Sequence, residues 1–264
     1  MEPWFVPEIF VILNLGFLTF DIYLAHSTNQ FRKPAEYIPL FFSACAPFVL
    51  AAALFFRSRW LAAWKIAGYL VGISAVVIGI AGAILHLDSA FFYERTIKSL
   101  TYSAPFAAPL AYTGLGFLVL NRMVNSGKKE WAQWVLFFTL GDFIGNFIFS
   151  LVDHAENGFF NRVEWVPVVA SAFAVGFLIT PLLVNVSRKF VLACGALLGI
   201  EIVVGTWGFV LHCLNNLHGP SIHAFDNFIY GAPPFAPLLF PNLAILGLIA
   251  LWRLLAPQPS DSAA

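Results

Sequence analysis

Charged residues are scarce in this chain: Asp, Glu, Lys and Arg make up 11% of its 264 residues, whereas hydrophobic residues make up 60%. A soluble domain of this size usually contains about 25% charged and about 45–50% apolar residues. The formal net charge is zero, and no basic patch indicates a nucleic-acid partner. The composition therefore excludes an ordinary soluble domain and predicts a protein that crosses the membrane several times.

Cysteine is also rare, and its spacing excludes two kinds of site. The three cysteines, Cys45, Cys194 and Cys213, all lie in apolar runs and form no C-x-x-C pair. An odd number without such spacing argues against a disulfide framework and against a thiolate metal site. The chain also lacks GxGxxG, a P-loop and G-x-S-x-G, so we do not expect nucleotide-driven chemistry.

Long apolar runs predict eight membrane-spanning helices. A helix needs about 20 residues to cross the hydrocarbon, and it satisfies its own backbone hydrogen bonds there. The runs lack the polar alternation that is typical of barrel strands. The predicted spans are 4–25, 38–56, 65–87, 103–121, 131–152, 165–185, 189–213 and 233–254.

The second half of the chain repeats the first half. The segment HSTNQFRKPAEYIP (26–39) matches HAENGFFNRVEWVP (154–167), with identical His, Phe, Glu and Pro positions. The segment YSAPFAAPL (102–110) matches YGAPPFAPL (230–238), and both pairs are separated by 128 residues. Agreement at one fixed separation indicates an internal duplication.

A third pair, GIAGAILH (79–86) and GTWGFVLH (205–212), matches at a separation of 126 residues. Four helices return the chain to the side of the membrane on which it began, so two such units enter in the same sense. We therefore predict an all-α integral membrane protein with eight transmembrane helices. They form two parallel four-helix repeats, 1–127 and 128–264, related by a pseudo-twofold axis.

The Lys and Arg residues favour one orientation of these helices. One set of predicted loops and tails holds nine of them and the other set holds five. The positive-inside rule then places both termini in the cytoplasm of a bacterial-type inner membrane or plasma membrane. The outward loops are 26–37, 88–102, 153–164 and 213–232.

Four histidines lie at the outer ends of the four predicted spans that run outward, namely His26, His86, His154 and His212. We expect them at one depth, near the outer edge of the hydrocarbon. Two imidazoles of one four-helix unit can point at one central object. Neutral imidazoles bind iron, and ligation by two histidines suits electron transfer.

Two glycines precede a histidine in each half, Gly79 and Gly82 before His86, and Gly205 and Gly208 before His212. At about 100° per residue, they share one helix face with that histidine. A face without side chains leaves room for a flat ring, which predicts one or two b-type haems. The alternative interpretation is close helix packing, the usual use of glycine rows in membrane helices.

Two other cofactors stay open at this stage. Non-haem iron or zinc suits the four histidines together with nearby acidic residues, although no H-E-x-x-H spacing occurs. The acidic residues at that level are Glu36, Asp88, Asp153 and Glu164. A chlorophyll-type pigment suits the same histidines and glycines among the 29 phenylalanines and eight tryptophans.

Two carboxylates are predicted deep in the membrane, about 17 Å below the histidine level at about 1.5 Å per residue. They are Asp142 and Glu201, and their counterparts in the first half are Asn14 and Ala75. Ionisable groups at this depth are functional candidates. One hypothesis gives them a catalytic role in a proton path toward the cofactor. The other makes them a hydrogen-bonded pin between the fifth and seventh spans.

Two tyrosines, Tyr102 and Tyr230, stand at the outer mouth of the fourth and eighth spans, just before paired prolines. Tyrosine is common there as an interfacial anchor. Because these two are duplicated and level with the histidines, we also consider them as cofactor-binding residues that cover or hydrogen-bond the cofactor.

Three functions follow from these features. The first is a membrane redox protein that passes electrons between a quinol or another lipid-soluble donor and a partner outside the membrane. The second is a metal-dependent membrane enzyme that acts on a lipid or isoprenoid at the same site. The third is a transporter, or a pigment-binding or accessory subunit of a larger membrane complex, with interfacial histidines.

Overall fold

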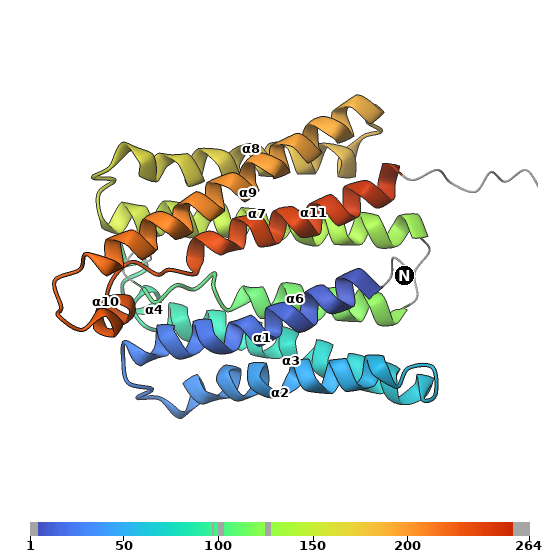
Figure 1. Cartoon of the computed structure of the whole chain (residues 1–264), viewed down its shortest axis with the longest axis horizontal. Helices are drawn as coiled ribbons and strands as arrows, with labels where there is room; N and C mark the ends of the chain where they lie inside the picture. The colour runs from blue at the N-terminus through green and yellow to red at the C-terminus, as the bar shows by residue number, and fades with distance from the viewer. Residues whose placement is uncertain (1–4, 97, 100–102, 125–127, 256–264) are drawn as a thin grey trace, which may run out of the picture.

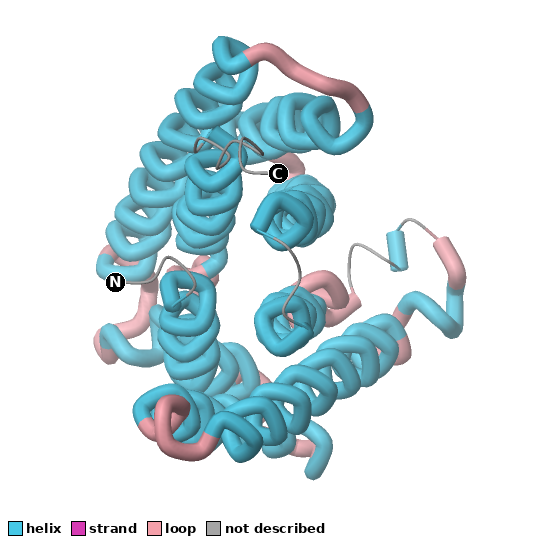
Figure 2. The backbone as a smooth tube through the Cα atoms, turned by 90° about the vertical axis from the view of Figure 1, so that its right-hand side faces the viewer, coloured by secondary structure: helices cyan, strands magenta, loops and turns pink. Residues whose placement is uncertain are grey.

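The part of the chain that the structure describes is mostly helical. The computed structural model describes residues 5–96, 98–99, 103–124 and 128–255, and these ranges contain helices, turns and loops but no strand (Figure 2). Among these residues, seven helices are long and apolar enough to cross a membrane. Three of them are preceded by a 3-10 turn that is counted with the helix, namely η1 (Pro34–Glu36), η2 (Arg162–Glu164) and η3 (Ala236–Leu238). The seven helices are α1 (Phe5–Ser27), α2 (Tyr37–Phe55), α3 (Leu61–Leu87), α7 (Lys128–Glu156), α8 (Trp165–Leu183), α9 (Arg188–Leu217) and α11 (Leu239–Leu255).

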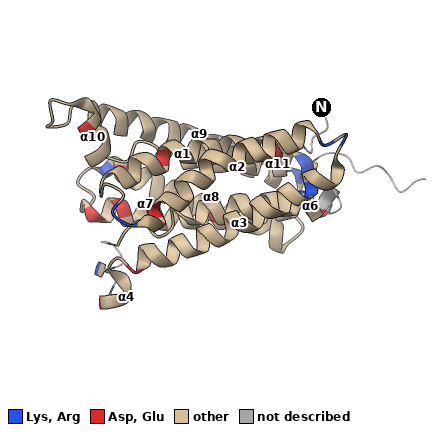
Figure 3. Ribbon diagram, turned by 90° about the horizontal axis from the view of Figure 1, so that it is seen from below, with Lys and Arg blue, Asp and Glu red and all other residues tan. Residues whose placement is uncertain are grey.

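The helix surfaces match a lipid environment. Large apolar side chains are exposed along the helices, including Phe48 at 76%, Val203 at 67% and Leu13 at 66%. Charged side chains gather mainly toward the two ends of the helices, with few between them (Figure 3). An apolar belt between charged ends is the arrangement of a multi-pass membrane protein, as the sequence predicts.

Contacts between the helices form two closed groups, which lie one above the other in Figure 1. In the first, α1 packs on α2, α2 on α3, α3 on α6 (Leu110–Val124), and α6 on α1. In the second, α7 packs on α8, α8 on α9, α9 on α11, and α11 on α7. We call these groups the first and the second bundle. Both place their first and third helices, α1 and α3 or α7 and α9, diagonally across the bundle.

The two bundles meet along α6 and α7, and residues of α1 also contact the beginning of the α11 segment. The amide of Asn242 donates a hydrogen bond to the side-chain oxygen of Asn14. Nearby, the rings of Phe17 and Phe235 meet edge to face, with centroids 4.9 Å apart. This seam mixes one polar contact with aromatic packing.

The fourth predicted span is wrong in its extent. The sequence predicts a helix over 103–121, but α6 covers only Leu110–Val124 and is shorter than the seven long helices. Residues 103–109 form turns, in which the N–H of Ala108 donates to the carbonyl of Pro105. Pro105 and Pro109 lack the backbone N–H that a helix interior requires, so the helix begins after the second proline.

A buried ionic cluster ties three helices of the first bundle together at the end where α1 begins. The indole nitrogen of Trp64 donates to Glu8 Oε1 at 2.5 Å, and Arg122 Nε lies 3.5 Å from Glu8 Oε2. The Arg122 guanidinium also lies 5.2 Å from the centroid of the Trp64 ring. Glu8 is only 3% exposed, and its charge is balanced inside the bundle. Sequence analysis missed this cluster, because its members lie far apart in the chain.

Candidate functional site

The four predicted histidines all lie toward the same end of the molecule. His26 and His86 occupy the last turns of α1 and α3, and His154 occupies the last turn of α7. His212 lies five residues before the end of α9. Each bundle therefore holds two histidines on its diagonal helices, at the end opposite to the beginning of α1 (Figure 1).

In the first bundle the two imidazoles face each other. The ring centroids of His26 and His86 are 6.2 Å apart, and the rings are nearly perpendicular at 80°. His86 Nδ1 lies 2.9 Å from the carbonyl oxygen of Pro105. A carbonyl only accepts, so Nδ1 carries the proton and donates it, which leaves the Nε2 lone pair of His86 free to bind a ligand.

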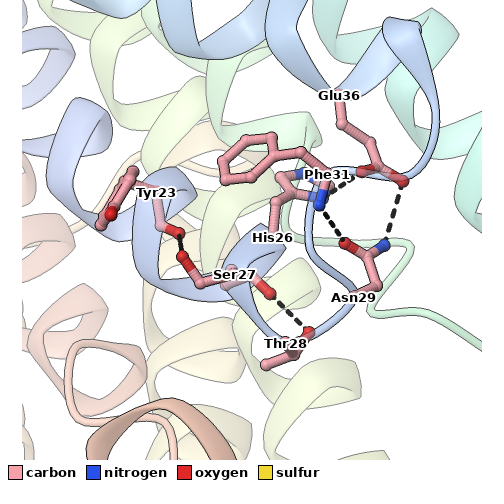
Figure 4. A network of polar contacts seen from close by, with 8 residues as sticks. Tyr23, His26, Ser27, Thr28, Asn29, Phe31 and Glu36 are labelled. Atoms are coloured by element: carbon pink, nitrogen blue, oxygen red, sulfur yellow. Dashed lines mark hydrogen bonds and ion pairs between the residues drawn. The ribbon is translucent and has the colours of Figure 1, made fainter. Parts of the chain in front are cut away.

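The turn after α1 holds a carboxylate against His26 (Figure 4). Glu36 Oε2 lies 4.0 Å from His26 Nδ1, and Asn29 donates to Glu36 Oε1 at 3.0 Å. Phe31, with a left-handed φ of 50°, donates its N–H to the carbonyl of His26 at 3.2 Å. The Phe31 ring stacks on Tyr37 with centroids 4.9 Å apart, which fixes the turn over the histidine.

The second bundle builds the same turn from the matching residues. Phe159 has a φ of 52° and donates its N–H to the carbonyl of His154 at 3.1 Å. Its ring stacks on Trp165 with centroids 4.0 Å apart. Glu164 Oε1 accepts from the backbone N–H of Asn161 at 3.3 Å. The ring of Phe159 meets His154 at 44°, the same angle at which Phe31 meets His26.

The second histidine pair also repeats the anchoring of the first. His212 Nδ1 donates to the carbonyl oxygen of Pro233 at 2.8 Å, as His86 does to Pro105. His154 lies close enough to Glu164 and His212 to interact with both electrostatically. Each half thus brings together two histidines and one glutamate, and no contact in the described part of the chain joins histidines of different halves.

In both sites, one carboxylate oxygen of the glutamate has no hydrogen-bond donor among the described residues. Glu36 Oε2 and Glu164 Oε2 are buried and accept no hydrogen bond from any residue that the structure describes. A buried carboxylate oxygen without a donor is costly unless a ligand, a proton or a water satisfies it. The same atom is left over in both halves, so both sites have an acceptor facing the histidines.

The glycines before the histidines face a neighbouring helix. A Cβ atom added at Gly79 would lie 2.7 Å from the backbone nitrogen of Thr113, and one at Gly82 would lie 2.8 Å from Pro109 Cβ. In the second bundle, a Cβ at Gly205 would lie 2.6 Å from Phe240 Cβ, and one at Gly208 would lie 3.0 Å from Pro237 Cβ. Close packing of α3 on α6, and of α9 on the η3–α11 segment, accounts for these glycines without a macrocycle.

Of the two predicted cofactor-binding tyrosines, only Tyr230 lies in the described part of the chain. Tyr102 lies outside the described residues. Tyr230 ends the short helix α10 (Ala224–Tyr230) and is 66% exposed, so its side chain faces away from the bundle interior.

The two deep carboxylates lie at different interfaces. Asp142 faces α6, because a Cβ added at Gly114 would lie 2.8 Å from Asp142 Oδ1. Glu201 is fully buried, and neither of its carboxylate oxygens has a hydrogen-bond partner among the described residues. The hypothesis that the two carboxylates form a hydrogen-bonded pin between α7 and α9 is therefore wrong, because Glu201 makes no hydrogen bond to any residue that the structure describes.

The acidic and histidine side chains do not form a compact metal cage. In residues 5–96, 98–99, 103–124 and 128–255, no group of three or more His, Cys, Asp or Glu side chains has the spacing of a metal site. A crevice of about 90 Å³ lies between the 103–107 segment and the end of α7, and its acidic walls are Asp153 and Glu156. It adjoins Pro105, whose carbonyl holds His86.

Comparison with known proteins gives no family for this chain: no family model, no curated protein and no solved structure matches it.

Proposed function

We propose that this protein carries electrons through two b-type haems, one held by His26 and His86 and the other by His154 and His212. The observation that carries the proposal is the paired imidazoles of the first bundle, perpendicular and 6.2 Å apart between centroids. Haem iron would supply one-electron chemistry, which bis-histidine ligation suits.

The donor set fits the iron of a haem. Metal–nitrogen bonds are about 2 Å long, so imidazoles with centroids 6.2 Å apart would both be able to bind one iron. A haem iron needs only two protein ligands, whereas a bare zinc or iron ion needs three or four. The two histidines of each half meet the first requirement, and the described residues supply no third ligand at metal-site spacing.

The outer partners of the imidazoles support the same proposal. Metal-binding histidines donate their other ring nitrogen to a carboxylate or a backbone carbonyl, which fixes the ring and raises its basicity. His86 and His212 donate Nδ1 to proline carbonyls, and His26 Nδ1 faces Glu36. The glycine face of α3 is covered by α6, so the proposal places no ring on that face.

The finer architecture belongs to the same proposal. We infer two parallel four-helix repeats with α6 as the eighth crossing, and both termini in the cytoplasm of a bacterial-type membrane. The matched turns at Phe31 and Phe159, and the matched order of helix contacts in the two bundles, support the duplication. The histidines then lie near the outer face, where a quinol or another lipid-soluble donor and an outer partner could exchange electrons with the haems.

A second candidate is favoured by the left-over oxygens of Glu36 and Glu164. Two histidines and one carboxylate form the ligand set of many non-haem iron and zinc enzymes. The described residues do not have that spacing in this structure, so this alternative requires the glutamate of each half to move toward the histidines. In this alternative each half would hold one ion, and the protein would act on a lipid or isoprenoid. Metal analysis of the purified protein separates the two: haem-bound iron supports the first function, and stoichiometric zinc or haem-free iron supports the second.

The visible spectrum of the purified protein, oxidised and dithionite-reduced, tests the leading function. We expect the sharp reduced bands of low-spin haem, with about half the haem lost in His86→Ala and about half in His212→Ala, because each histidine serves one site. The double variant should bind none.

His223→Ala is the matched control, because His223 is exposed and lies beyond α9 at the same end of the molecule. It should retain the full haem content. A protein that stays colourless after expression with excess haem, while remaining folded, would overturn the haem proposal.

A further inference from the structure

Two buried polar side chains in the second bundle have no partners in the described chain. Glu201 of α9 is fully buried, and Asn146 of α7 is 4% exposed. Neither oxygen of Glu201 and neither polar atom of the Asn146 amide makes a hydrogen bond there. Buried polar groups are almost always satisfied, so four unpaired atoms in one bundle indicate a ligand.

Both side chains lie on helix faces that turn toward α11. A Cβ added at Gly247 of α11 would lie 3.2 Å from Thr139 Cγ2 and 2.8 Å from Leu198 Cδ1. Asn146 follows Thr139 by seven residues, which returns it to the same face of α7. Glu201 follows Leu198 by three residues on α9, on the side that carries Gly205 against Phe240 of α11. The two polar groups therefore border the same helix.

Their heights along the bundle follow from the shared contact at Gly247. At about 1.5 Å per residue, Asn146 lies about 6 Å further toward the histidine end than Glu201. Ser150 and His154 follow on α7 at further steps of about 6 Å each. One water that bonds to two groups at about 2.8 Å bridges such a step.

Within the described part of the second bundle, no cationic side chain lies at the depth of Glu201. Within its described range Trp165–Leu183, α8 contains no charged residue. The charged residue of α11, Arg253, lies about nine residues below the level of Glu201, or about 13 Å away along the helix. The carboxylate of α7, Asp142, faces α6. An isolated carboxyl group in this apolar surrounding is favoured in its neutral, protonated form.

We propose that the second bundle contains a proton-binding site at Glu201, reached from the histidine end through waters ordered by Asn146 and Ser150. A proton from the outer solution passes along these waters to one oxygen of the Glu201 carboxylate, which becomes a neutral acid. The amide of Asn146 orients water and does not itself carry the proton. This site does not depend on whether the outer histidines bind haem.

The first bundle does not contain this route. The positions that match Glu201, Asn146 and Ser150 are Ala75, Leu18 and Ile22, which are apolar. This route is therefore assigned to the second half of the molecule only.

Infrared spectroscopy of the full-length protein in lipid vesicles tests this proposal. The wild-type protein should show the C=O stretching band of a protonated carboxyl group, and Glu201→Gln should lose it, whereas Asp142→Asn should keep it. On transfer to D2O the band should shift rapidly. In the double variant Asn146→Leu, Ser150→Ala the band should remain but shift roughly tenfold more slowly or slower still, which corresponds to about 1.4 kcal/mol or more of added barrier.

Thr206→Ala is the control for the exchange measurement, because Thr206 lies on α9 but is exposed and bonds the carbonyl of Ile202. It should exchange at the wild-type rate. Absence of a carboxyl band that depends on Glu201 would overturn the site. An unchanged rate of D2O exchange in the double variant would overturn the route through Asn146 and Ser150. A carboxyl band that appears only when sodium is omitted would overturn the proton site and identify Glu201 as a cation ligand. The haem spectrum is independent of all these infrared results, so the two proposals can fail separately.

Discussion

The two bundles are alike at their histidine ends and different in their interiors. Both carry a histidine anchored on a proline carbonyl, His86 on Pro105 and His212 on Pro233. Below that level both bundles bury a serine, Ser43 or Ser171, and the first buries Glu8 and Arg122 near the beginning of α1. Only the second buries polar side chains at the matching positions of Asn146, Ser150 and Glu201. A shared end with divergent interiors indicates that the duplicated turn is constrained in both halves, whereas the interior is free to specialise.

The polar cluster of the first bundle lies elsewhere and is paired. Glu8 is matched by Arg122 and Trp64, so its charge is balanced. Glu201 has no such partner among the described residues. The contrast separates a carboxylate that stabilises helix packing from one that is retained at a cost in stability, and such a cost is typical of functional groups.

Placing the buried acid of the second bundle at the matching position of the first bundle should change the stability most. Ala75, 1% exposed on α3, matches Glu201. We expect Ala75→Glu to lower the free energy of unfolding by about 3 kcal/mol more than the volume control Ala75→Met, because an unpaired carboxyl group is buried. Thermal unfolding in detergent measures both variants.

The reverse change sharpens the same comparison. Glu201→Met should raise the stability of the second bundle, because it removes an unsatisfied group without leaving a large cavity. Equal stability of Ala75→Glu and Ala75→Met would mean that both interiors tolerate a lone carboxyl group, and the contrast between the bundles would then have no energetic basis.

The close helix contacts at Gly79 and Gly205 should lose similar amounts of stability when a methyl group is added, and less than the buried acid at position 75 costs. We expect Gly79→Ala and Gly205→Ala each to cost about 2 kcal/mol, because the new Cβ meets backbone or Cβ atoms of the neighbouring helix. Gly145 and Gly199 are controls, since a Cβ there meets nothing within 4 Å. Substitution of these controls by Ala should be neutral or stabilising by up to about 1 kcal/mol. Destabilisation confined to one bundle would show that the seams are not equivalent.

The sequence predicted the helices well because the hydrophobic period and the charged ends are local signals. It placed the fourth span too early, since 103–109 is as apolar as a helix but contains Pro105 and Pro109. That segment is held by contacts that hydropathy does not register, including the bond from His86 to Pro105. A short apolar segment with an irregular backbone can therefore have the same composition as a membrane-spanning helix.

The candidate site was predicted in part for a related reason. Helical periodicity showed that Gly79 and Gly82 share a face with His86, but periodicity does not reveal what covers that face. The covering residues are Pro109, just before α6, and Thr113 in its first turn, and the beginning of this helix was misplaced. The pairing of His26 with His86 needed the diagonal order of the bundle, which repeats alone do not specify.

The smallest difference between the bundles concerns one hydroxyl group. In the first bundle, Tyr112 Oη donates to the carbonyl of Pro39 at 2.9 Å and also contacts Ser43 Oγ. The matching positions in the second bundle are Phe240 and Ser171, and Ser171 donates to the carbonyl of Pro167 at 2.7 Å instead. Tyr112→Phe therefore gives the first bundle the arrangement of the second.

We expect Tyr112→Phe to cost about 1 kcal/mol, the net value of a buried hydrogen bond, because Ser43 can turn to the carbonyl of Pro39 as Ser171 turns to that of Pro167. In the Ser43→Ala background the same change should cost less, since the contact between the two hydroxyls is already gone. Thermal unfolding of the four proteins of this cycle measures the coupling. A loss above about 3 kcal/mol would mean that Ser43 cannot make this turn, and that the two bundles differ in backbone as well as in side chains.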